Sequence, residues 1–161
     1  MKILTESPDG HHTDTAKALG YITQLLCTGS RKALPISAIA NWLTPPVALG
    51  QFVLYFDEQG NPVGYATWAF LADEVSALME RDVINLLHLS EWNEGLNLWV
   101  TDLVCLPGFS RPVIRHLRDV TLGDFPLARS LKRDAEESLL RSRTFRARKR
   151  SHFDVAPSCS Q

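Results

Sequence analysis

The chain has 161 residues, of which 45% are hydrophobic and 22% charged, and its formal net charge is −1. These values are those of an ordinary soluble domain with a single core. Charges or prolines interrupt every apolar run well before the roughly 18 residues of a membrane span, which excludes a transmembrane protein. The segment MKILTESPDGHH contains no apolar core of secretory length, so we expect a cytoplasmic protein.

The cysteines and histidines form no recognisable metal site. Cys27, Cys105 and Cys159 are odd in number and far apart, which fits neither a disulfide framework nor zinc-ligand spacing. The five histidines give no metal pattern, and no Ser, His and Asp order is compelling. We therefore expect reduced thiols and no metal or other cofactor.

Basic residues are concentrated near the C-terminal end. Residues 129–150 contain nine lysines and arginines against three acids, a balance of +6, so the rest of the chain carries −7. A segregated positive segment suits an acidic partner, whether nucleic acid, an anionic surface or an acidic protein. The alternative is a solvated tail or a charged strand edge.

The first half of the chain predicts a tail, two helices and a hairpin. Residues 1–12 are expected to be a loose tail, and apolar residues at helical spacing predict a helix over 15–27. A second helix is expected from Pro35 to about Leu43, where the proline pair 45–46 ends it. The runs QFVLYF and VGYATWAFL, separated by the turn-like DEQGNP, predict a β-hairpin.

The second half predicts a helix over about 73–81, a strand within NLWVTDLVCLPG, and a helix with Ser110 as its N-cap. Two further β-capable runs follow at about 127–132 and 138–145. This order of elements implies a mixed α/β domain in which helices flank a mostly antiparallel central sheet.

Asp102 is the unusual residue of the strand in NLWVTDLVCLPG. In a regular strand it shares a face with Leu98, Val100, Val104 and Leu106, where an unpaired ion costs several kcal/mol. Two interpretations remain open: an acid paired with an arginine, or a carboxylate at the mouth of a functional site.

The helix after this strand is a second candidate site. The unpaired amides at the start of a helix bind phosphate or an oxyanion, and Ser110 and Arg111 stand at this start. We predict that these two residues bind substrate. The alternative is an ordinary capped helix, because no GxGxxG or Walker-type loop is present.

One motif resembles the RTX toxin-activating lysine acyltransferases. In EWNEGLNLWVTDLVCLPG, Trp92, Gly95, Trp99 and Asp102 follow the family's Trp, Gly, Trp, Asp series. The aspartate of that series belongs to the active site, so the resemblance implies a catalytic role for Asp102.

Three other segments resemble the same family, in the same order. NPVGYATWA is similar to the signature Asn-x-Pro-Val-Ala-Tyr-Cys-Ser-Trp-Ala, with Tyr65, Trp68 and Ala69 as direct matches. LGYITQLL and LPISAIANWLTPPVALGQFVLY resemble the family's N-terminal part, and RTFRARK resembles a late strand, so the likeness covers about 18–149. On this resemblance we predict that Tyr65, Trp68 and Trp99 bind substrate.

The resemblance implies a single GNAT-like acyltransferase domain over 13–150, between flexible tails at 1–12 and 151–161. It implies transfer of a fatty acyl group from acyl carrier protein to a lysine of an RTX-type protoxin, with no cofactor besides that donor. Family members tend to form homodimers. Acyl carrier protein is acidic, which gives the basic segment a role.

One position departs from the family pattern. A lysine amine, with a pKa of about 10.4, must lose a proton for attack, and the family assigns this task to a histidine that follows a serine. The corresponding segment here, TGSRKALPIS, places Arg31 at the histidine position and Thr28 at the serine position. An arginine stays protonated and does not act as a base.

Three alternatives follow from this departure. Asp102 takes the proton itself if its apolar neighbours favour the neutral acid. Otherwise a histidine from elsewhere, such as His11 or His12, reaches the site. In the third alternative Arg31 binds an anionic group, such as the phosphate of the phosphopantetheine arm, or pairs with Asp102, and the enzyme is weak or inactive.

The sequence therefore predicts an acyltransferase or, as the alternative, an impaired relative that binds acyl carrier protein or a toxin-like partner. A third class, a small nucleic-acid binder, rests on the basic segment alone, and we do not expect a nucleic-acid partner.

Overall fold

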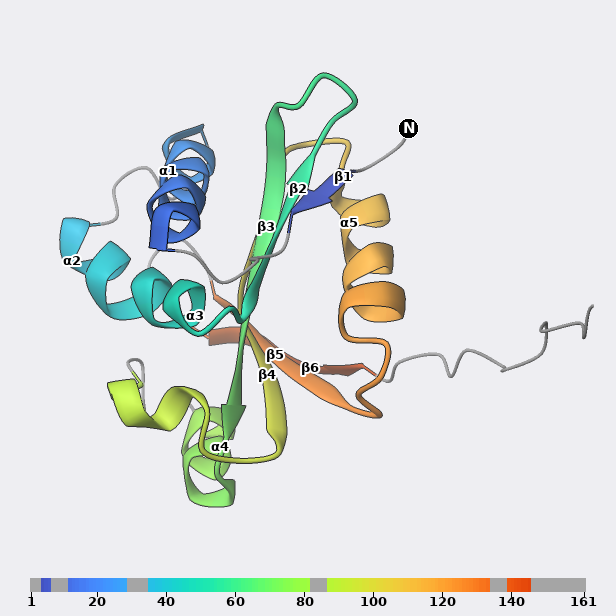
Figure 1. Ribbon diagram of the computed structural model, residues 1–161. Helices are drawn as coiled ribbons and strands as arrows, with labels where there is room; N and C mark the ends of the chain where they lie inside the picture. Colours follow the sequence, from blue (N-terminus) through green and yellow to red (C-terminus); the bar gives the residue numbers. More distant parts are fainter. Residues whose placement is uncertain (1–3, 7–11, 29–34, 82–86, 134–138, 146–161) are drawn as a thin grey trace, which may run out of the picture.

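The computed structural model describes residues 4–6, 12–28, 35–81, 87–133 and 139–145. Its centre is a six-stranded sheet whose strands lie in chain order (Figure 1). All neighbouring strands are antiparallel except β4 and β5, which are parallel. The strands are β1 (Leu4–Glu6), β2 (Phe52–Phe56), β3 (Pro62–Leu71), β4 (Asn97–Cys105), β5 (Ala128–Arg133) and β6 (Leu139–Phe145).

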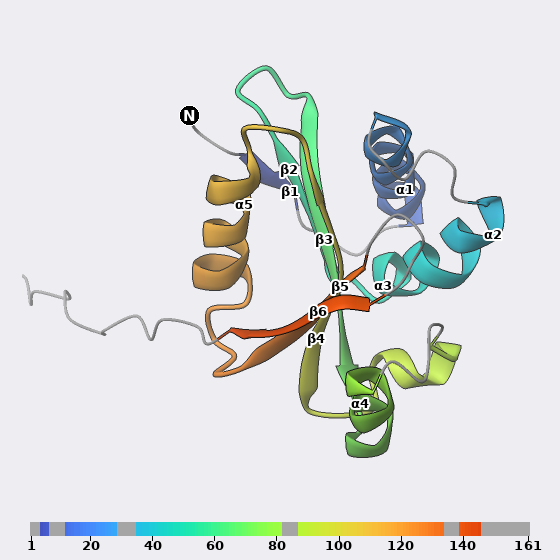
Figure 2. The same cartoon turned by 180° about the vertical axis from the view of Figure 1, so that it is seen from behind.

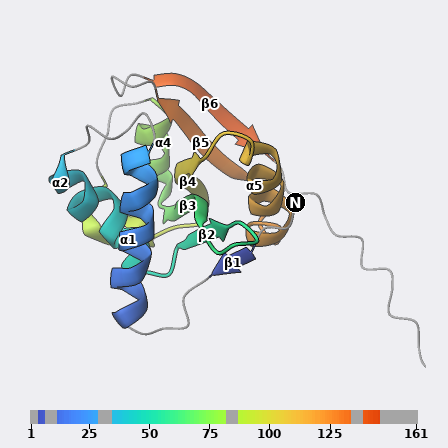
Figure 3. The ribbon, with the colours of Figure 1, turned by 90° about the horizontal axis from the view of Figure 1, so that it is seen from above.

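Helical segments cover both faces of this sheet (Figure 3). They are α1 (His12–Thr28), α2 (Ile36–Ala38), α3 (Thr44–Ala48), α4 (Asp73–Glu80) and α5 (Ser110–His116), with the π-helical turns η1 (Ile39–Leu43) and η3 (Leu117–Thr121) and the 3₁₀ turn η2 (Leu89–Trp92). The helix α1 and the segment α2-η1-α3 cover one face, and α5 covers the other. The predicted α/β domain with a mostly antiparallel sheet is therefore confirmed.

Three groups of buried side chains hold these layers together. The α1-side core joins α1, η1 and α3 to β2 and β3 and contains Ile22, Leu25, Leu43, Val47, Phe52, Leu54, Phe56 and Tyr65. The α5-side core contains Val53, Tyr55, Ala66, Leu98, Val100, Val113 and Leu117. The α4-side core contains Ala69, Leu71, Met79, Leu87, Trp92 and Trp99. Burial of these apolar side chains is the main stabilising contribution to such a fold.

Two expectations about the N-terminal region are wrong. Residues 4–6 are not part of a loose tail, because they pair with Leu54–Phe56 of β2 as an edge strand. The proline pair 45–46 does not end the helical segment, which continues to Ala48. Both prolines lie in the first turn of α3, where no intrahelical N–H bond is required and the fixed φ of proline suits the helix.

A β-bulge interrupts the regular alternation of β4. Thr67 of β3 lies opposite Asp102, and the next residue, Trp68, lies opposite Val100. Thr101 is therefore an extra residue of β4. It lies between Val100 and Asp102, whose partners Trp68 and Thr67 are consecutive residues of β3. Its hydroxyl forms a hydrogen bond with the Thr67 hydroxyl at 2.8 Å, which fixes the bulge at this place.

The bulge reverses the face of every later residue of β4. Leu98 and Val100 pack in the α5-side core, whereas Val104 and Leu106 pack against the α1-side core. The prediction that Asp102 shares a face with Leu98 and Val100 is therefore wrong. Asp102 lies on the face that α1 covers.

The loop before β4 explains the glycine of the Trp, Gly, Trp, Asp series. The amide of Gly95 donates to the Phe70 carbonyl at 3.0 Å, so the loop lies tightly against the end of β3. A Cβ at Gly95 would stand 2.1 Å from the Leu71 carbonyl oxygen. Only glycine fits this approach without displacing backbone.

We therefore expect Gly95→Ala to lower the free energy of unfolding by about 1–3 kcal/mol, as overpacking does in a core. Gly20→Ala is the matched control, because nothing lies within 4 Å of the Cβ position at Gly20 in α1. This control should be neutral or stabilising by up to about 1 kcal/mol, because alanine is the better helix former. Urea unfolding followed by tryptophan fluorescence measures both, and equal midpoints for the two variants would contradict the role of Gly95.

Candidate active site

Asp102 lies in the middle of β4 with only 5% of its surface exposed, and it is the only acid among the buried residues of the described chain. Two groups of the described residues donate hydrogen bonds to its carboxylate. The Tyr65 hydroxyl donates to Oδ2 at 2.7 Å, and the Leu103 amide donates to Oδ1 at 2.9 Å. Hydrogen bonds of this kind offset the cost of burying a carboxylate.

Tyr65 is fully buried and reaches Asp102 diagonally across the β3–β4 pair. Its Cα lies opposite Val104, two residues from Asp102. Diagonal neighbours on one face of a sheet stand within reach of a long aromatic side chain. The Tyr65 ring packs in the α1-side core with Ile22 and Leu25, so α1 covers the Tyr65–Asp102 pair.

The structure places the other predicted catalytic residues as follows. Thr28 is the last residue of α1 and is exposed, and its hydroxyl donates to the Leu25 carbonyl at 2.9 Å, within its own helix. Arg31 lies outside the described residues, so the proposed pairing of Arg31 with Asp102 stays a prediction.

The predicted substrate-binding residues divide between the two faces of the sheet. Trp99 lies on the same side as Asp102, because the bulge brings residues three positions apart onto one face. Trp99 is fully buried in the α4-side core, and its Nε1 donates to Ser76 Oγ at 3.0 Å. This contact anchors α4 to the sheet, and a direct contact of Trp99 with substrate stays a prediction.

Trp68, Ser110 and Arg111 are not brought together with Asp102. The half-buried Trp68 packs against the α5-side core. Ser110 is the first residue of α5, Phe109 is its N-cap, and the Ser110 hydroxyl accepts from Cys105 Sγ at 3.3 Å. The N-cap prediction for Ser110 is therefore wrong by one residue. Substrate binding by Trp68, Ser110 and the exposed Arg111 stays a prediction.

The described histidines lie away from the Tyr65–Asp102 pair. The half-buried ring of His116 stacks edge-on against Tyr55 on the α5 face, at a centroid distance of 5.6 Å. Burial lowers the pKa of His116. His88 is exposed and caps η2, where its Nδ1 accepts from the Ser90 amide. His11 and His152 lie outside the described residues, as does the side chain of His12.

The strands β4 and β5 separate close to Asp102. They pair at Trp99–Arg129 and Val100–Ser130, while β4 continues along β3 as far as Cys105 (Figure 2). The edge of β4 that follows Val100 is therefore not paired with β5. Such an edge carries backbone donors and acceptors for an extended ligand.

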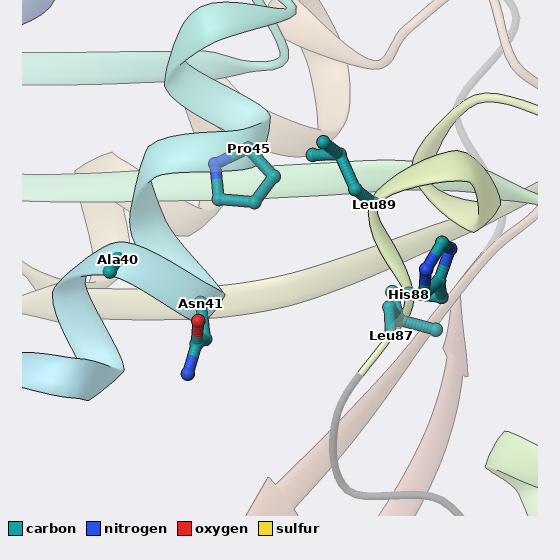
Figure 4. A pocket seen from close by; sticks show the side chains of 6 residues that line it. All are labelled: Ala40, Asn41, Pro45, Leu87, His88 and Leu89. Atoms are coloured by element: carbon teal, nitrogen blue, oxygen red, sulfur yellow. The ribbon is translucent and has the colours of Figure 1, made fainter.

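A groove of about 430 Å³ lies between the segment 40–45 and the segment 87–89 (Figure 4). Its buried floor is formed by Pro45 and Leu87, and its exposed rim by Ala40, Asn41, His88 and Leu89. Leu43 and Val47, on the other side of the same helical segment, pack in the α1-side core with Tyr65. One helical segment thus contacts both the groove and the Asp102 neighbourhood.

Three features of this region were not predicted from the sequence. The sequence carries no direct signal for the bulge or for the groove. The contact of Tyr65 with Asp102 has a weak signal, because a tyrosine within an apolar strand needs a partner for its hydroxyl. Most of the basic segment lies outside the described side chains, and its first member, Arg129, pairs with Glu80 at 2.9 Å.

The described part of the chain contains neither a metal-binding cluster nor a membrane-spanning helix. Within it, no three His, Cys, Asp or Glu side chains are grouped as metal ligands would be. None of its helices combines the length and the apolar character that crossing a membrane requires.

Comparison with known proteins gives relatives of two kinds. An uncharacterized protein of Synechocystis sp. is 32% identical over 105 residues, which cover 64% of this chain and 71% of that protein. The lysine-acyltransferase RtxC of Vibrio cholerae is 29% identical over 83 residues, which cover 50% of this chain and 54% of that enzyme. The chain thus spans about half the length of this curated acyltransferase.

A GNAT-family acetyltransferase from Listeria monocytogenes superimposes with a TM-score of 0.47 and 16% identity, over 84% of this chain and 79% of that one. The model of the RTX toxin acyltransferase family matches residues 11–150, which include all four motifs that resemble this family. The chain therefore belongs to the RTX toxin acyltransferase family.

Proposed function

We propose that this protein transfers a fatty acyl group from the thioester of acyl carrier protein to the ε-amine of a lysine in an RTX-type protoxin, in the bacterial cytoplasm. The observation that carries this proposal is the buried carboxylate of Asp102, oriented by two donors, in a chain of this acyltransferase family. A buried acid with a defined orientation is a common feature of active sites.

The reaction is the aminolysis of a thioester. The lysine nitrogen attacks the carbonyl carbon, an amide C–N bond forms, the C–S bond breaks, and the phosphopantetheine thiol leaves. The amine gives up a proton, which Asp102 accepts and which finally goes to the leaving sulfur. In this proposal Asp102 is the catalytic base, because an arginine occupies the family's histidine position.

Two further features support an acyl carrier protein donor. The edge of β4 after Val100, which no described strand pairs on the β5 side, offers hydrogen-bonding groups along which the extended phosphopantetheine arm can lie. The basic segment 129–150 has the charge that attracts an acidic carrier.

A second candidate is a relative that has lost catalysis and binds acyl carrier protein or a toxin-like partner. The presence of Arg31 where the family has its histidine favours this alternative. Both candidates predict binding that weakens with salt, so only a measurement of transfer distinguishes them.

The acyl transfer should depend on Asp102. We expect Asp102→Asn to lower kcat by about 10²–10⁴-fold, the usual effect of losing a general base. The matched control is Asp124→Asn, which changes an exposed acid in the turn after η3 and should leave kcat unchanged. Intact-protein mass spectrometry of an RTX protoxin, incubated with long-chain acyl carrier protein and each variant, measures the product.

Two outcomes would contradict this assignment. If the wild-type chain transfers no acyl group from any carrier-bound donor, the binding-protein alternative replaces the proposal. If Asp102→Asn retains wild-type kcat, the chain is a transferase but Asp102 is not its base.

The groove between the segments 40–45 and 87–89 is a suitable place for the acyl chain. Its floor is apolar, its volume lies in the range of small-molecule sites, and its helical segment also packs against the neighbourhood of Tyr65. Leu89 on the rim is 69% exposed although it is apolar, so a ligand that covers it gains hydrophobic energy.

Leu89→Gln should therefore lower kcat/KM for a long-chain donor by roughly fourfold for each methylene contact that is lost, since one such contact is worth about 0.8 kcal/mol. The same substitution should leave transfer from a short-chain donor nearly unchanged. Leu96→Gln is the control, because Leu96 is 96% exposed and does not line the groove. Equal losses in both variants, or an equal loss for both chain lengths, would show that the acyl chain lies elsewhere.

A further inference from the structure

The bond between Tyr65 and Asp102 joins two side chains that water barely reaches. Tyr65 has no exposed surface and Asp102 has 5%, and the O–O distance of 2.7 Å is that of a strong hydrogen bond. In such surroundings a donor is worth more to a carboxylate than it is in water.

The Leu103 amide and the Tyr65 hydroxyl hold different oxygens of the Asp102 carboxylate. The Leu103 amide belongs to the same strand and holds Oδ1 close to the backbone at 2.9 Å. The Tyr65 hydroxyl belongs to the neighbouring strand and holds Oδ2. The terminal torsion of an aspartate is intrinsically broad. A donor at each oxygen therefore defines the plane of the carboxylate.

The position of Tyr65 is itself determined by the fold. Its ring lies in the α1-side core, and its strand is held in register with β4 on both sides of the bulge. The hydroxyl therefore has little freedom to follow Asp102 if that side chain moves. The sheet and α1 therefore fix the position of Tyr65, and Tyr65 in turn fixes the orientation of the Asp102 carboxylate.

We propose that Tyr65 is the positioning residue of the acyl transfer site: its hydroxyl holds the Asp102 carboxylate in the orientation that receives the proton of the attacking lysine. This inference rests on the proposed function. It gives Tyr65 a role through Asp102, in place of the substrate contact that the sequence predicts. Misorientation of a catalytic group by about 1 Å costs on the order of 10²-fold in rate.

The chain offers a closely matched control for this proposal. Tyr55 is also fully buried, in the neighbouring strand β2, but it lies on the α5 face. No hydrogen bond of normal geometry reaches its hydroxyl from the described residues. Burial raises the pKa of Tyr55, so this phenol stays neutral. Tyr55→Phe therefore removes a buried hydroxyl on the opposite side of the same sheet, away from Asp102.

The experiment measures kcat and KM for acyl transfer by the full chain, with long-chain acyl carrier protein and an RTX protoxin as substrates. The variants are Tyr65→Phe, Tyr55→Phe, Asp102→Asn and the double variant of Tyr65→Phe with Asp102→Asn. Each rate is expressed per folded molecule, from a fluorescence unfolding curve of the same sample. A loss of folded protein is thereby separated from a loss of catalysis.

We expect Tyr65→Phe to lower kcat by about 10- to 100-fold, with KM for the donor changed less than about twofold, because the hydroxyl acts on the base and not on the substrate. Tyr55→Phe should leave both parameters unchanged. The double variant should be no slower than Asp102→Asn alone, because Tyr65 acts through Asp102.

Three results would overturn the positioning role while leaving the proposed function intact. They are an unchanged kcat in Tyr65→Phe, a loss in Tyr65→Phe that appears in KM alone, and losses that multiply in the double variant. A fourth result, absence of transfer by the wild-type chain, would overturn the proposed function and this inference together.

Discussion

The extra residue in β4 is the constraint on which the site depends. If β4 were regular through Thr101, the alternation of side chains would place Asp102 on the same face as Val100, in the α5-side core. With the bulge, the carboxylate lies on the α1 face, where Tyr65 is in reach. The same bulge places Trp99 and Asp102 on one face. Residues three positions apart in a regular strand would lie on opposite faces, so this spacing in the motif is compatible with a shared face only because of the bulge.

Several residues around Asp102 serve to hold this arrangement. Trp99 attaches α4 to β4 through Ser76, and the Thr67–Thr101 bond fixes the bulge. Gly95 lets the preceding loop approach β3 closely. Of the Trp, Gly, Trp, Asp series, Gly95 and Trp99 thus have structural reasons for their identity, and Trp92 is buried in the α4-side core. The acid is the member whose chemistry the packing does not require.

The sequence predicted those parts of the fold that depend on local pattern. Helical spacing located α1, and the two β-rich runs on either side of a turn located β2 and β3, because these elements are long enough for their periodicity to appear. Residues 4–6 were missed because a strand of three residues has no periodicity of its own. The segment 44–48 was missed because a proline pair ends one helix and begins another with equal ease.

The site was predictable in its residue types but not in its geometry. The motifs identified Asp102 and Tyr65 separately. Their contact depends on a diagonal register across two strands, and the face of Asp102 depends on a bulge whose place only the strand pairing defines. Trp68 and Ser110 are likewise separated from Asp102 by the sheet, because they lie on its α5 side. A sequence pattern does not determine on which side of a sheet a helix that is distant in the chain packs.

The proposed function requires that this chain forms an amide bond on a lysine. The most direct measurement is a single-turnover reaction with a radiolabelled acyl group on acyl carrier protein and an RTX protoxin, followed by hydroxylamine treatment of the products. An amide resists hydroxylamine, whereas a thioester does not. We expect label on the protoxin that survives this treatment and that appears only when the wild-type chain is present. Label that stays on the carrier, or that hydroxylamine removes from the protoxin, would contradict the proposed function.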